Sequence, residues 1–336
     1  MWKGRTEGWY APCDQTSESQ MTADVRSADA TEQKAHEVTG VLDPQTVLDH
    51  AHLIVHSLDK VLPFYTDVLR FKVHRREDQP DGRFVALGAG AHDLLRLTER
   101  PASPSAGRTA GMYHMSFVVQ ERVDLARWLQ RIAETKTPVE GLVHHAPAAE
   151  AIYLPDPEGN TVELNWDPPR EVWSRPGQPP FKGNLPLDTD SLLQLLVGQP
   201  EEWAGPPPDT TFSHIHLYVG DLEAASRFYE GVLGFERTAA FPGQAVFVSA
   251  GGYHHHVAFN VWKGRGIPPQ PEGSAGLRYY VVRLPDQPEF NRVLARVRAA
   301  GLPVQDVPDA ANAGATGGVL LRDPAGLGVV LAVDSA

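Results

Sequence analysis

Histidines stand at matching positions in the two halves of this chain, and imidazoles are common metal ligands. His50 and His52 occur in the first half, and His214 and His216 occur 164 positions later in the second. Within each pair the residues are two positions apart, so on a β-strand both side chains point to the same face. The pattern predicts a duplicated fold that collects metal ligands on strand faces.

Glu163 is a carboxylate inside an apolar stretch. Its neighbours are Val162 and Leu164, and Trp166 follows shortly after. A carboxylate on such a strand is expensive to bury unless a cation lies beside it. We therefore expect Glu163 to contribute to a metal site.

Three consecutive histidines, His254–His256, form another unusual feature. Because consecutive strand residues alternate between faces, at most His254 and His256 point the same way. His256 could form a partial metal site with His214. The equally weighted alternative is that the run lies at a strand edge or at a domain interface, and the sequence leaves both open.

The elements that must hold these residues repeat as well. Phe64-Tyr65 and Phe228-Tyr229 are separated by the same 164 positions. Alternating and helical spacings of apolar residues predict the remaining elements. The strands expected are Leu48–Val55, Arg83–Leu87, Asp93–Leu97, Tyr113–Val119, Ala151–Leu154, Thr161–Trp166, Ser213–Val219, Ala245–Ala250, His256–Trp262, Arg278–Leu284, Val319–Arg322 and Gly328–Val333, and the helices are Leu58–Leu69, kinked at Pro63, Val123–Thr135, Leu222–Leu233 and Pro288–Ala300.

Each repeat divides again, which gives four β-α-β-β-β modules in two pairs. The predicted fold class is α+β, with two tandem domains. We expect a disordered tail over residues 1–46 and a first domain over 47–168 that holds the metal site. A Pro-rich connector over 169–210, with a short helix at Ser191–Val197, leads to a second domain over 211–336.

Bulk properties exclude several classes of protein. A net charge of -12 over 336 residues argues against nucleic-acid binding, because few cations are left to neutralise phosphates. Cys13 is the only cysteine, so no intramolecular disulfide or thiolate cluster can form. The sequence shows neither a membrane-spanning apolar run nor a secretory signal. We expect a cytoplasmic protein without membrane contact, and a homo-oligomer is compatible with the sequence.

Several separate motifs resemble one known family. They are Gly111–Phe117, Glu150–Leu154, Asp156–Leu164, Gly183–Asp188 and Ser249–Val257. Together with the paired modules they resemble the vicinal oxygen chelate (VOC) superfamily, which includes glyoxalase I, fosfomycin and bleomycin resistance proteins and extradiol dioxygenases. The nearest match is the two-domain catechol 2,3-dioxygenase-like (CatE-like) group. The resemblance runs from about residue 47 to the end of the chain.

The resemblance implies a metal site in the first domain. The family takes its ligands from the first strand of one module and from the first and last strands of the partner module, which here are His50, His114 and Glu163. Two imidazoles and one carboxylate suit a non-haem Fe(II), and Mn(II) also fits these donors. The expectation is that the three strands belong to one curled sheet. His214 and His256 are secondary candidates.

The second domain departs from this pattern. Tyr279 occupies the position that corresponds to His114, and Val330 occupies the position that corresponds to Glu163. Two of the three expected ligands are therefore missing there, although His214 corresponds to His50. This favours the first domain as the metal-binding one.

The resemblance also implies residues for the chemistry. Tyr153 lies where extradiol dioxygenases place a tyrosine near the substrate, and His144 or His145 lies near their acid/base histidine. The resulting prediction is an extradiol dioxygenase in which a small aromatic diol and O2 meet at Fe(II). Three aromatic residues, Tyr113, Phe117 and Trp166, are expected to line its pocket.

Two other classes of function stay open. One is a glyoxalase-type isomerase or a metal-dependent transferase, whose usual fourth protein ligand would come from the strand Asp93–Leu97. Asp93 is the only carboxylate in that strand, which counts against this class. The other is a binding or resistance protein that holds an aromatic compound without a metal. Fold alone does not separate these classes.

Overall fold

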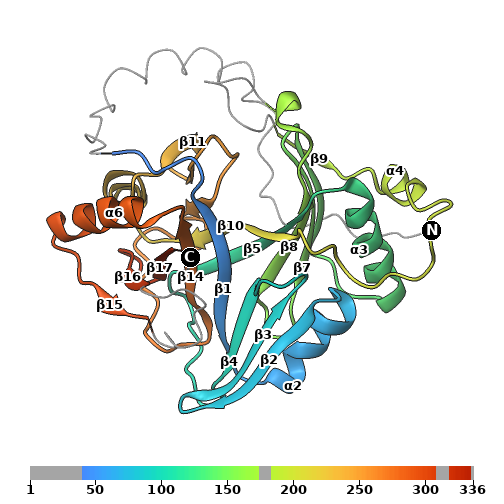
Figure 1. Ribbon diagram of the computed structural model, residues 1–336, viewed down its shortest axis with the longest axis horizontal. Coiled ribbons are helices and arrows are strands. Elements are labelled where there is room, and N and C mark those ends of the chain that lie inside the picture. The colour runs from blue at the N-terminus through green and yellow to red at the C-terminus, as the bar shows by residue number, and fades with distance from the viewer. Residues whose placement is uncertain (1–39, 174–182, 308–317, 334–336) are drawn as a thin grey trace. The chain divides into compact units, whose positions relative to one another are not determined.

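The computed structural model describes residues 40–173, 183–307 and 318–333. Most of the polar tail predicted over residues 1–46, and part of the predicted connector, lie outside these ranges. The described residues form two large mixed β-sheets with helices packed on them (Figure 1). Within them, no helix combines the length and the apolar character that crossing a membrane requires.

The strands follow the predicted modular order. In the eight-stranded sheet, called sheet A here, they are β1 (Val47–Val55), β2 (Lys72–Gln79), β3 (Gly82–Gly88), β4 (Leu95–Glu99), β14 (Gly276–Leu284), β15 (Gln305–Asp306), β16 (Val319–Arg322) and β17 (Gly328–Val333). In the nine-stranded sheet B they are β5 (Gly111–Val119), β6 (Gly141–Ala146), β7 (Ala149–Pro155), β8 (Thr161–Trp166), β9 (Gly183–Pro186), β10 (Thr211–Tyr218), β11 (Glu236–Phe241), β12 (Ala245–Ser249) and β13 (Val257–Asn260).

The helices complete four modules. They are α2 (Leu58–Pro63), α3 (Arg122–Thr135), α4 (Thr189–Gln194), α5 (Leu222–Ser226) and α6 (Gln287–Ala299), with π-helical turns at Phe64–Val68 and Arg227–Leu233 and a 3₁₀ turn at Arg170–Val172. Modules 1 to 4 are here β1–β4, β5–β8, β10–β13 and β14–β17, each with its helix. The predicted α+β class is confirmed.

The sheets join the modules in an order that the sequence did not reveal. Sheet A has the order β15-β16-β17-β14-β1-β4-β3-β2, and sheet B has the order β11-β12-β13-β10-β5-β8-β7-β6-β9. Module 1 therefore shares a sheet with module 4, and module 2 shares a sheet with module 3. The expectation that β1, β5 and β8 belong to one sheet is wrong, because β1 pairs with β14 while β5 pairs with β10, both antiparallel.

Strand alternation separates an apolar core from polar sheet faces. On β5, Met115 and Phe117 are buried in the main hydrophobic cluster, which also includes residues of sheet A and of the helices. His114 and Ser116 alternate with them and point to the opposite face of sheet B. On β1 the same alternation directs Ala51 into the cluster. The histidines thus lie on the faces turned away from the main core.

The first helix is interrupted where the sequence predicted a kink. The α-helix ends at Pro63, and a π-helical turn over Phe64–Val68 continues the chain to Leu69. Proline lacks a backbone N–H to donate within a helix. The repeat has the same π-helical turn at Arg227–Leu233 without a proline, so Pro63 alone does not account for the change. The turn leaves Phe64 and Tyr65 buried.

The connector adds one strand and one helix to module 2. β9 pairs with β6 and extends the edge of sheet B. Helix α4 begins after Asp188, whose carboxylate accepts a hydrogen bond from the backbone N–H of Ser191. It occupies Thr189–Gln194, slightly earlier than the predicted Ser191–Val197. β9 proves important, because it brings a polar side chain to the site described next.

Candidate metal centre

Two imidazoles meet one carboxylate on the polar face of sheet B. Nε2 of His214 lies 2.8 Å from Oε2 of Glu163, and Nε2 of His114 lies 3.1 Å from the same oxygen. The three side chains are buried, and one ligand atom from each lies within 4.8 Å of the others. These residues are called the trio below.

Three adjacent strands place the trio. Ser116 on β5 is the register partner of Glu163 on β8 and of His214 on β10. Glu163 and His214 therefore flank Ser116 from either side. His114 precedes Ser116 by two residues and shares its face. Neighbouring strands are about 5 Å apart, which lets the three side chains converge. The register of β10 against β5 is irregular between Phe212 and His214, next to this point.

The electrostatics of the trio suit a cation. Burial alone would raise the pKa of Glu163, but His214 and His114 outweigh it and hold that pKa well below its usual value. Burial lowers the pKa of His214, against the opposing effect of Glu163. An ionised carboxylate beside a neutral imidazole is the protonation state that metal coordination requires.

A second layer of contacts orients one ligand. Nδ1 of His214 lies 3.3 Å from Oγ of Ser213, and this hydroxyl donates to the backbone carbonyl of Ser116. Nδ1–H of His214 can therefore donate to the hydroxyl, which leaves the Nε2 lone pair directed toward Glu163. A metal-ligating histidine commonly holds its other N–H in this way. The donor types and their geometry thus fit a divalent metal with a two-histidine, one-carboxylate ligand set.

His50 lies outside this group, so the structure does not bring the predicted set of His50, His114 and Glu163 together. His50 lies on β1 in sheet A, where its Nδ1 is 2.7 Å from the carboxylate of Asp49. Its ring packs against Tyr279, with ring centroids 6.3 Å apart. The physical reason is the pairing of modules. The strand beside β5 is β10, so His214 takes the place that the sequence assigned to His50.

In sheet A, the positions equivalent to the trio keep only one of the three metal-binding side chains, that of His50. On the face where a second site would form, Tyr279 and Val330 replace the other two ligands, and both belong to a separate small apolar cluster. His52 forms a hydrogen bond with Thr98. Asp93 contacts His74, Arg75 and Arg96 and lies just before β4 of this sheet, not beside the trio.

His145 and Tyr153 lie beside the trio. Nε2 of His145 is 2.8 Å from the hydroxyl of Tyr153, whose ring lies 5.4 Å from that of His114. Tyr153 is also the register partner of Glu163. Nδ1 of His145 is 2.7 Å from Oδ1 of Asn184 on β9. The amide oxygen can only accept, so His145 carries its proton on Nδ1 and presents Nε2 as an acceptor.

His144 points away from this arrangement. It is the neighbour of His145 on β6, and consecutive strand residues face opposite ways. Burial lowers the pKa of His145, so the ring is neutral near pH 7. Of the two histidines that the sequence offered, His145 is the one placed to exchange a proton near the trio.

His255, in the run His254–His256, lies beside the trio, which the sequence did not predict. The ring of His255 packs on that of His214, with centroids 4.2 Å apart. His214, His254 and His255 form a second group whose ligand atoms lie within 4.8 Å of one another. His256 is outside both groups, and its Nδ1 accepts a hydrogen bond from the backbone N–H of Ala250.

The other histidine of the second pair has a different role. Nε2 of His216 is 2.9 Å from Nδ2 of Asn260, and the amide donates to it. Burial together with His114 and His214 lowers the pKa of His216 well below its usual value. His216 is therefore a neutral, hydrogen-bonded neighbour of the trio.

The three aromatic residues expected around the substrate lie in different places. The ring of Tyr113 contacts that of His114, with centroids 4.8 Å apart. Phe117 is fully buried in the main core and packs against Phe71 and Phe212. Trp166 lines a separate pocket, described below, and its indole N–H donates to a backbone carbonyl. Tyr113 is the member of the three closest to the trio.

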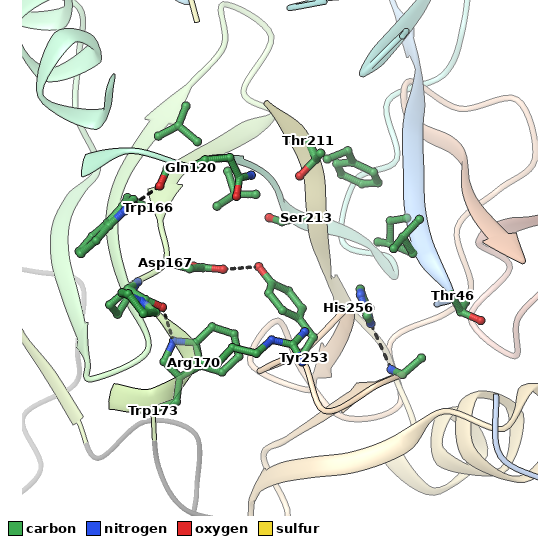
Figure 2. Close-up of a pocket in the computed structure, with 18 of the residues that line it drawn as sticks. Thr46, Gln120, Trp166, Asp167, Arg170, Trp173, Thr211, Ser213, Tyr253 and His256 are labelled. Atoms are coloured by element: carbon green, nitrogen blue, oxygen red, sulfur yellow. Dashed lines mark hydrogen bonds between the residues drawn. The ribbon is translucent and has the colours of Figure 1, made fainter. Parts of the chain in front are cut away.

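A pocket of about 620 Å³ lies at the end of sheet B where β5 and β8 finish and β10 begins (Figure 2). Trp166, Trp173 and Tyr253 give it aromatic walls. Asp167 and Tyr253 point toward each other in it, and the tyrosine hydroxyl donates to the carboxylate over 2.5 Å.

Comparisons with known proteins identify the family and relatives of this chain. The Glyoxalase/Bleomycin resistance protein/Dioxygenase superfamily matches residues 47–164 and 211–331. Catechol-2,3-dioxygenase of Bacillus subtilis is 38% identical over 269 residues, which cover 78% of this chain and 90% of that protein. Lactoylglutathione lyase of Neisseria meningitidis is 28% identical over 120 residues, 34% of this chain and 86% of that enzyme.

Solved structures agree on the fold. A candidate dioxygenase from Bacillus subtilis superposes with a TM-score of 0.61 at 15% identity, covering 88% of this chain and 87% of that one. Glyoxalase I from Zea mays superposes with a TM-score of 0.52 at 17% identity, covering 86% and 92%.

Four β-α-β-β-β modules with a two-histidine, one-carboxylate trio define a class of metal-dependent enzymes built on duplicated modules. The chain belongs to the Glyoxalase/Bleomycin resistance protein/Dioxygenase superfamily and is a homologue of catechol-2,3-dioxygenase. The predicted family and the predicted dioxygenase-like enzyme are confirmed.

Some residues of the site carried a signal that sequence reasoning did not use. His214 was visible through the repeat, but its sheet partner was not. His255 stood in a histidine run whose orientation could not be read. Asn184 lay in a motif of the connector that carried no chemical signal, since only the pairing of β9 with β6 brings it to His145.

Proposed function

We propose that the protein is a non-haem Fe(II) extradiol dioxygenase that cleaves the ring of a catechol-type diol. The observation that carries the proposal is the trio of His114, Glu163 and His214, with His145 and Tyr153 beside it. Iron bound there would offer open coordination positions for a diol and O2, and Mn(II) fits the same donors.

The chain's own residues supply the remaining chemistry. A diol that chelates a cation must give up protons, and a neutral histidine near pH 7 accepts them well. Nε2 of His145 already faces the hydroxyl of Tyr153 and so is placed for this role. Asn184 holds the opposite side of the imidazole ring and fixes its orientation. Tyr153, between His145 and His114, can hydrogen-bond to a substrate oxygen.

Anaerobic metal analysis tests the proposal. Wild-type protein, Glu163→Ala, His214→Ala and the control His50→Ala are purified without oxygen, and bound iron is measured alongside O2 uptake with catechol. Wild type and His50→Ala are expected to hold about one iron per chain, whereas Glu163→Ala and His214→Ala lose it. His50→Ala is the matched control because the same residue type is removed from the other sheet.

Other outcomes would redirect the assignment. Loss of iron in His50→Ala with retention in His214→Ala would contradict the proposed centre. A bound metal without O2 consumption on any diol would favour an isomerase or transferase. Protein that binds an aromatic compound equally well after Glu163→Ala would favour a binding protein.

A further inference from the structure

The positions of sheet A that correspond to the metal centre have lost an acidic group and gained a basic one. Val330 stands where sheet B has Glu163, so the carboxylate is absent. At the repeat distance of 164 residues, Arg96 on β4 stands where sheet B has Asn260 on β13. A site that loses a carboxylate and gains a guanidinium attracts anions, whereas its counterpart attracts cations.

The two histidines of β1 and Arg96 lie on one face of sheet A. His52 is the register partner of Arg96 on β4 and of Tyr279 on β14. The rings of His50 and His52 both pack against Tyr279, with centroids 6.3 Å and 4.9 Å from it. Ala51, between the two histidines, points into the main core, so this face is turned away from the core.

Two polar atoms on this face are buried and have no hydrogen-bond partner among the described residues. They are Nη1 of Arg96 and Nε2 of His50, in residues that are 4% and 1% exposed. Burial and the charge of Arg96 lower the pKa of His50, which agrees with a guanidinium close to the imidazole. Because buried polar atoms in proteins are almost always hydrogen-bonded, a partner from outside the chain is expected here.

The carboxylates nearby do not supply that partner. Asp93 accepts from Nε of Arg96 and from Nη2 of Arg75, each over 3.0 Å. Asp49 lies 2.7 Å from Nδ1 of His50. Neither carboxylate bonds to Nη1 of Arg96 or to Nε2 of His50. An additional anion would accept from the guanidinium, and from Nε2 of His50 once that nitrogen carries a proton.

We propose that this face of sheet A binds one small anion between Nη1 of Arg96 and Nε2 of His50. Neither residue lines the 620 Å³ pocket of Figure 2, so the anion must fit among packed side chains. A monatomic halide such as chloride is the class that meets this condition. The anion would compensate the buried guanidinium and stabilise sheet A. The site needs neither iron nor a diol, so it does not depend on the proposed function.

Bromide, which replaces chloride and has an accessible absorption edge, locates the anion directly. Crystals of the full wild-type chain are grown in sodium bromide and measured at that edge. One anomalous peak is expected within hydrogen-bonding reach of Nη1 of Arg96, on the side of His50. Density for a water molecule there, without an anomalous signal, would overturn the proposal. This measurement needs no variant, so it decides the site even if a substitution of Arg96 prevents folding.

Urea unfolding tests binding in solution. Wild type, Arg96→Gln and Arg75→Gln are compared in sodium chloride and in sodium gluconate of equal ionic strength, with a chelator present. Gluconate is too large for the site, so the unfolding midpoint of wild type is expected to be higher in chloride, because a ligand that binds only the folded state stabilises it. Arg96→Gln should lose this difference between the salts.

Arg75→Gln is the matched control. It removes the same charge and another partner of Asp93, but it leaves Nη1 of Arg96 in place. Arg75→Gln should therefore keep most of the difference between the salts. An equal loss in both variants would show a general effect of charge and would contradict the site. Equal midpoints of wild type in the two salts would also contradict it, and a bromide peak seen alongside that result would mean an adventitious ion only.

Discussion

Glu163 is the residue on which the metal centre depends. It is buried between two imidazoles that approach the same carboxylate oxygen, at 2.8 Å and 3.1 Å. A buried carboxylate with no compensating group costs several kcal/mol, and a shared cation would compensate the charge of Glu163. Such a cation would be held by Glu163 together with the Nε2 atoms of His114 and His214, which face the same carboxylate oxygen.

The proposed role of His145 as a proton acceptor predicts how its substitution changes kcat. In His145→Gln, kcat on a catechol-type diol is expected to fall about 10²- to 10⁴-fold, the usual contribution of a general acid or base, while iron content is unchanged. His144→Gln is the control, because its side chain faces the other way on β6. Steady-state O2 uptake with parallel iron analysis provides the measurement. Equal losses in both variants would contradict the role given to His145.

The sequence pattern predicts that His114 and Glu163 lie together, but it pairs them with His50 where the structure has His214. His114 and Glu163 belong to one module, so their convergence follows from local order along the chain. His50 and His214 are equivalent in the repeat, and nothing near either residue states which of them lies beside β5. That choice depends on which modules share a sheet, and contacts between distant segments decide it.

At the scale of elements, modules 2 and 4 each have a turn before their last strand whose aspartate binds a tyrosine of the preceding module. In module 4, Oδ1 of Asp323 accepts from the backbone N–H groups of Ala325 and Leu327, while Oδ2 accepts from the hydroxyl of Tyr229. In module 2, Asp156 accepts from Tyr65 in the same way. Each turn thus binds the helical segment of the module that precedes it.

Asp323 gives a prediction for stability. Burial raises its pKa to about 6, although its hydrogen bonds lower it, against an ordinary value of 3.8. The unfolded chain therefore ionises first, and the free energy of unfolding falls as pH rises from about 4 to about 6. Above pH 6 the loss is constant, on the order of 3 kcal/mol. Asp323→Asn should remove this decrease in the free energy of unfolding with pH.

Urea unfolding at pH 4 and pH 7, with a chelator present, measures the effect. The difference between the two pH values is expected to be smaller in Asp323→Asn than in wild type. Tyr229→Phe is the control. It keeps the carboxyl group and removes a hydrogen bond that lowers its pKa, so the fall with pH should persist or grow. An unchanged pH dependence in Asp323→Asn would contradict the assignment.

β2, β6 and β9 were not predicted, because none of them shows a clear alternation of apolar and polar residues. β2 carries the residues KVHRREDQ, whose charged side chains hide the apolar alternation by which strands are recognised. β6 is half-buried along its whole length, and β9 is a short exposed edge strand. Such strands form because a neighbour offers unpaired backbone groups, which a single sequence does not display.

At the scale of the whole described chain, the four modules are linked in a ring. Sheet A joins module 1 to module 4, and sheet B joins module 2 to module 3. The hydrogen bond from Tyr65 to Asp156 joins modules 1 and 2, and that from Tyr229 to Asp323 joins modules 3 and 4. Each half of the sequence contributes a strand to the metal centre, so neither half contains the trio alone.

An engineered disulfide tests this arrangement. Val118 on β5 and Thr211 on β10 are antiparallel register partners, whose Cα atoms in such pairs lie about 4.5–5.5 Å apart, within disulfide range. In a Cys13→Ser background, which removes the only native thiol, Val118→Cys/Thr211→Cys is expected to oxidise to one intramolecular bond. Peptide mapping without reductant should find residues 118 and 211 in a single linked peptide. The link should raise the free energy of unfolding by about 2–4 kcal/mol, since it closes a long loop in the unfolded chain. Thr211→Cys alone and the reduced double variant are the controls. Two free thiols in the folded, oxidised double variant would contradict the pairing of β5 with β10. In that case the two halves would build separate sheets, and His50 would again be a candidate ligand.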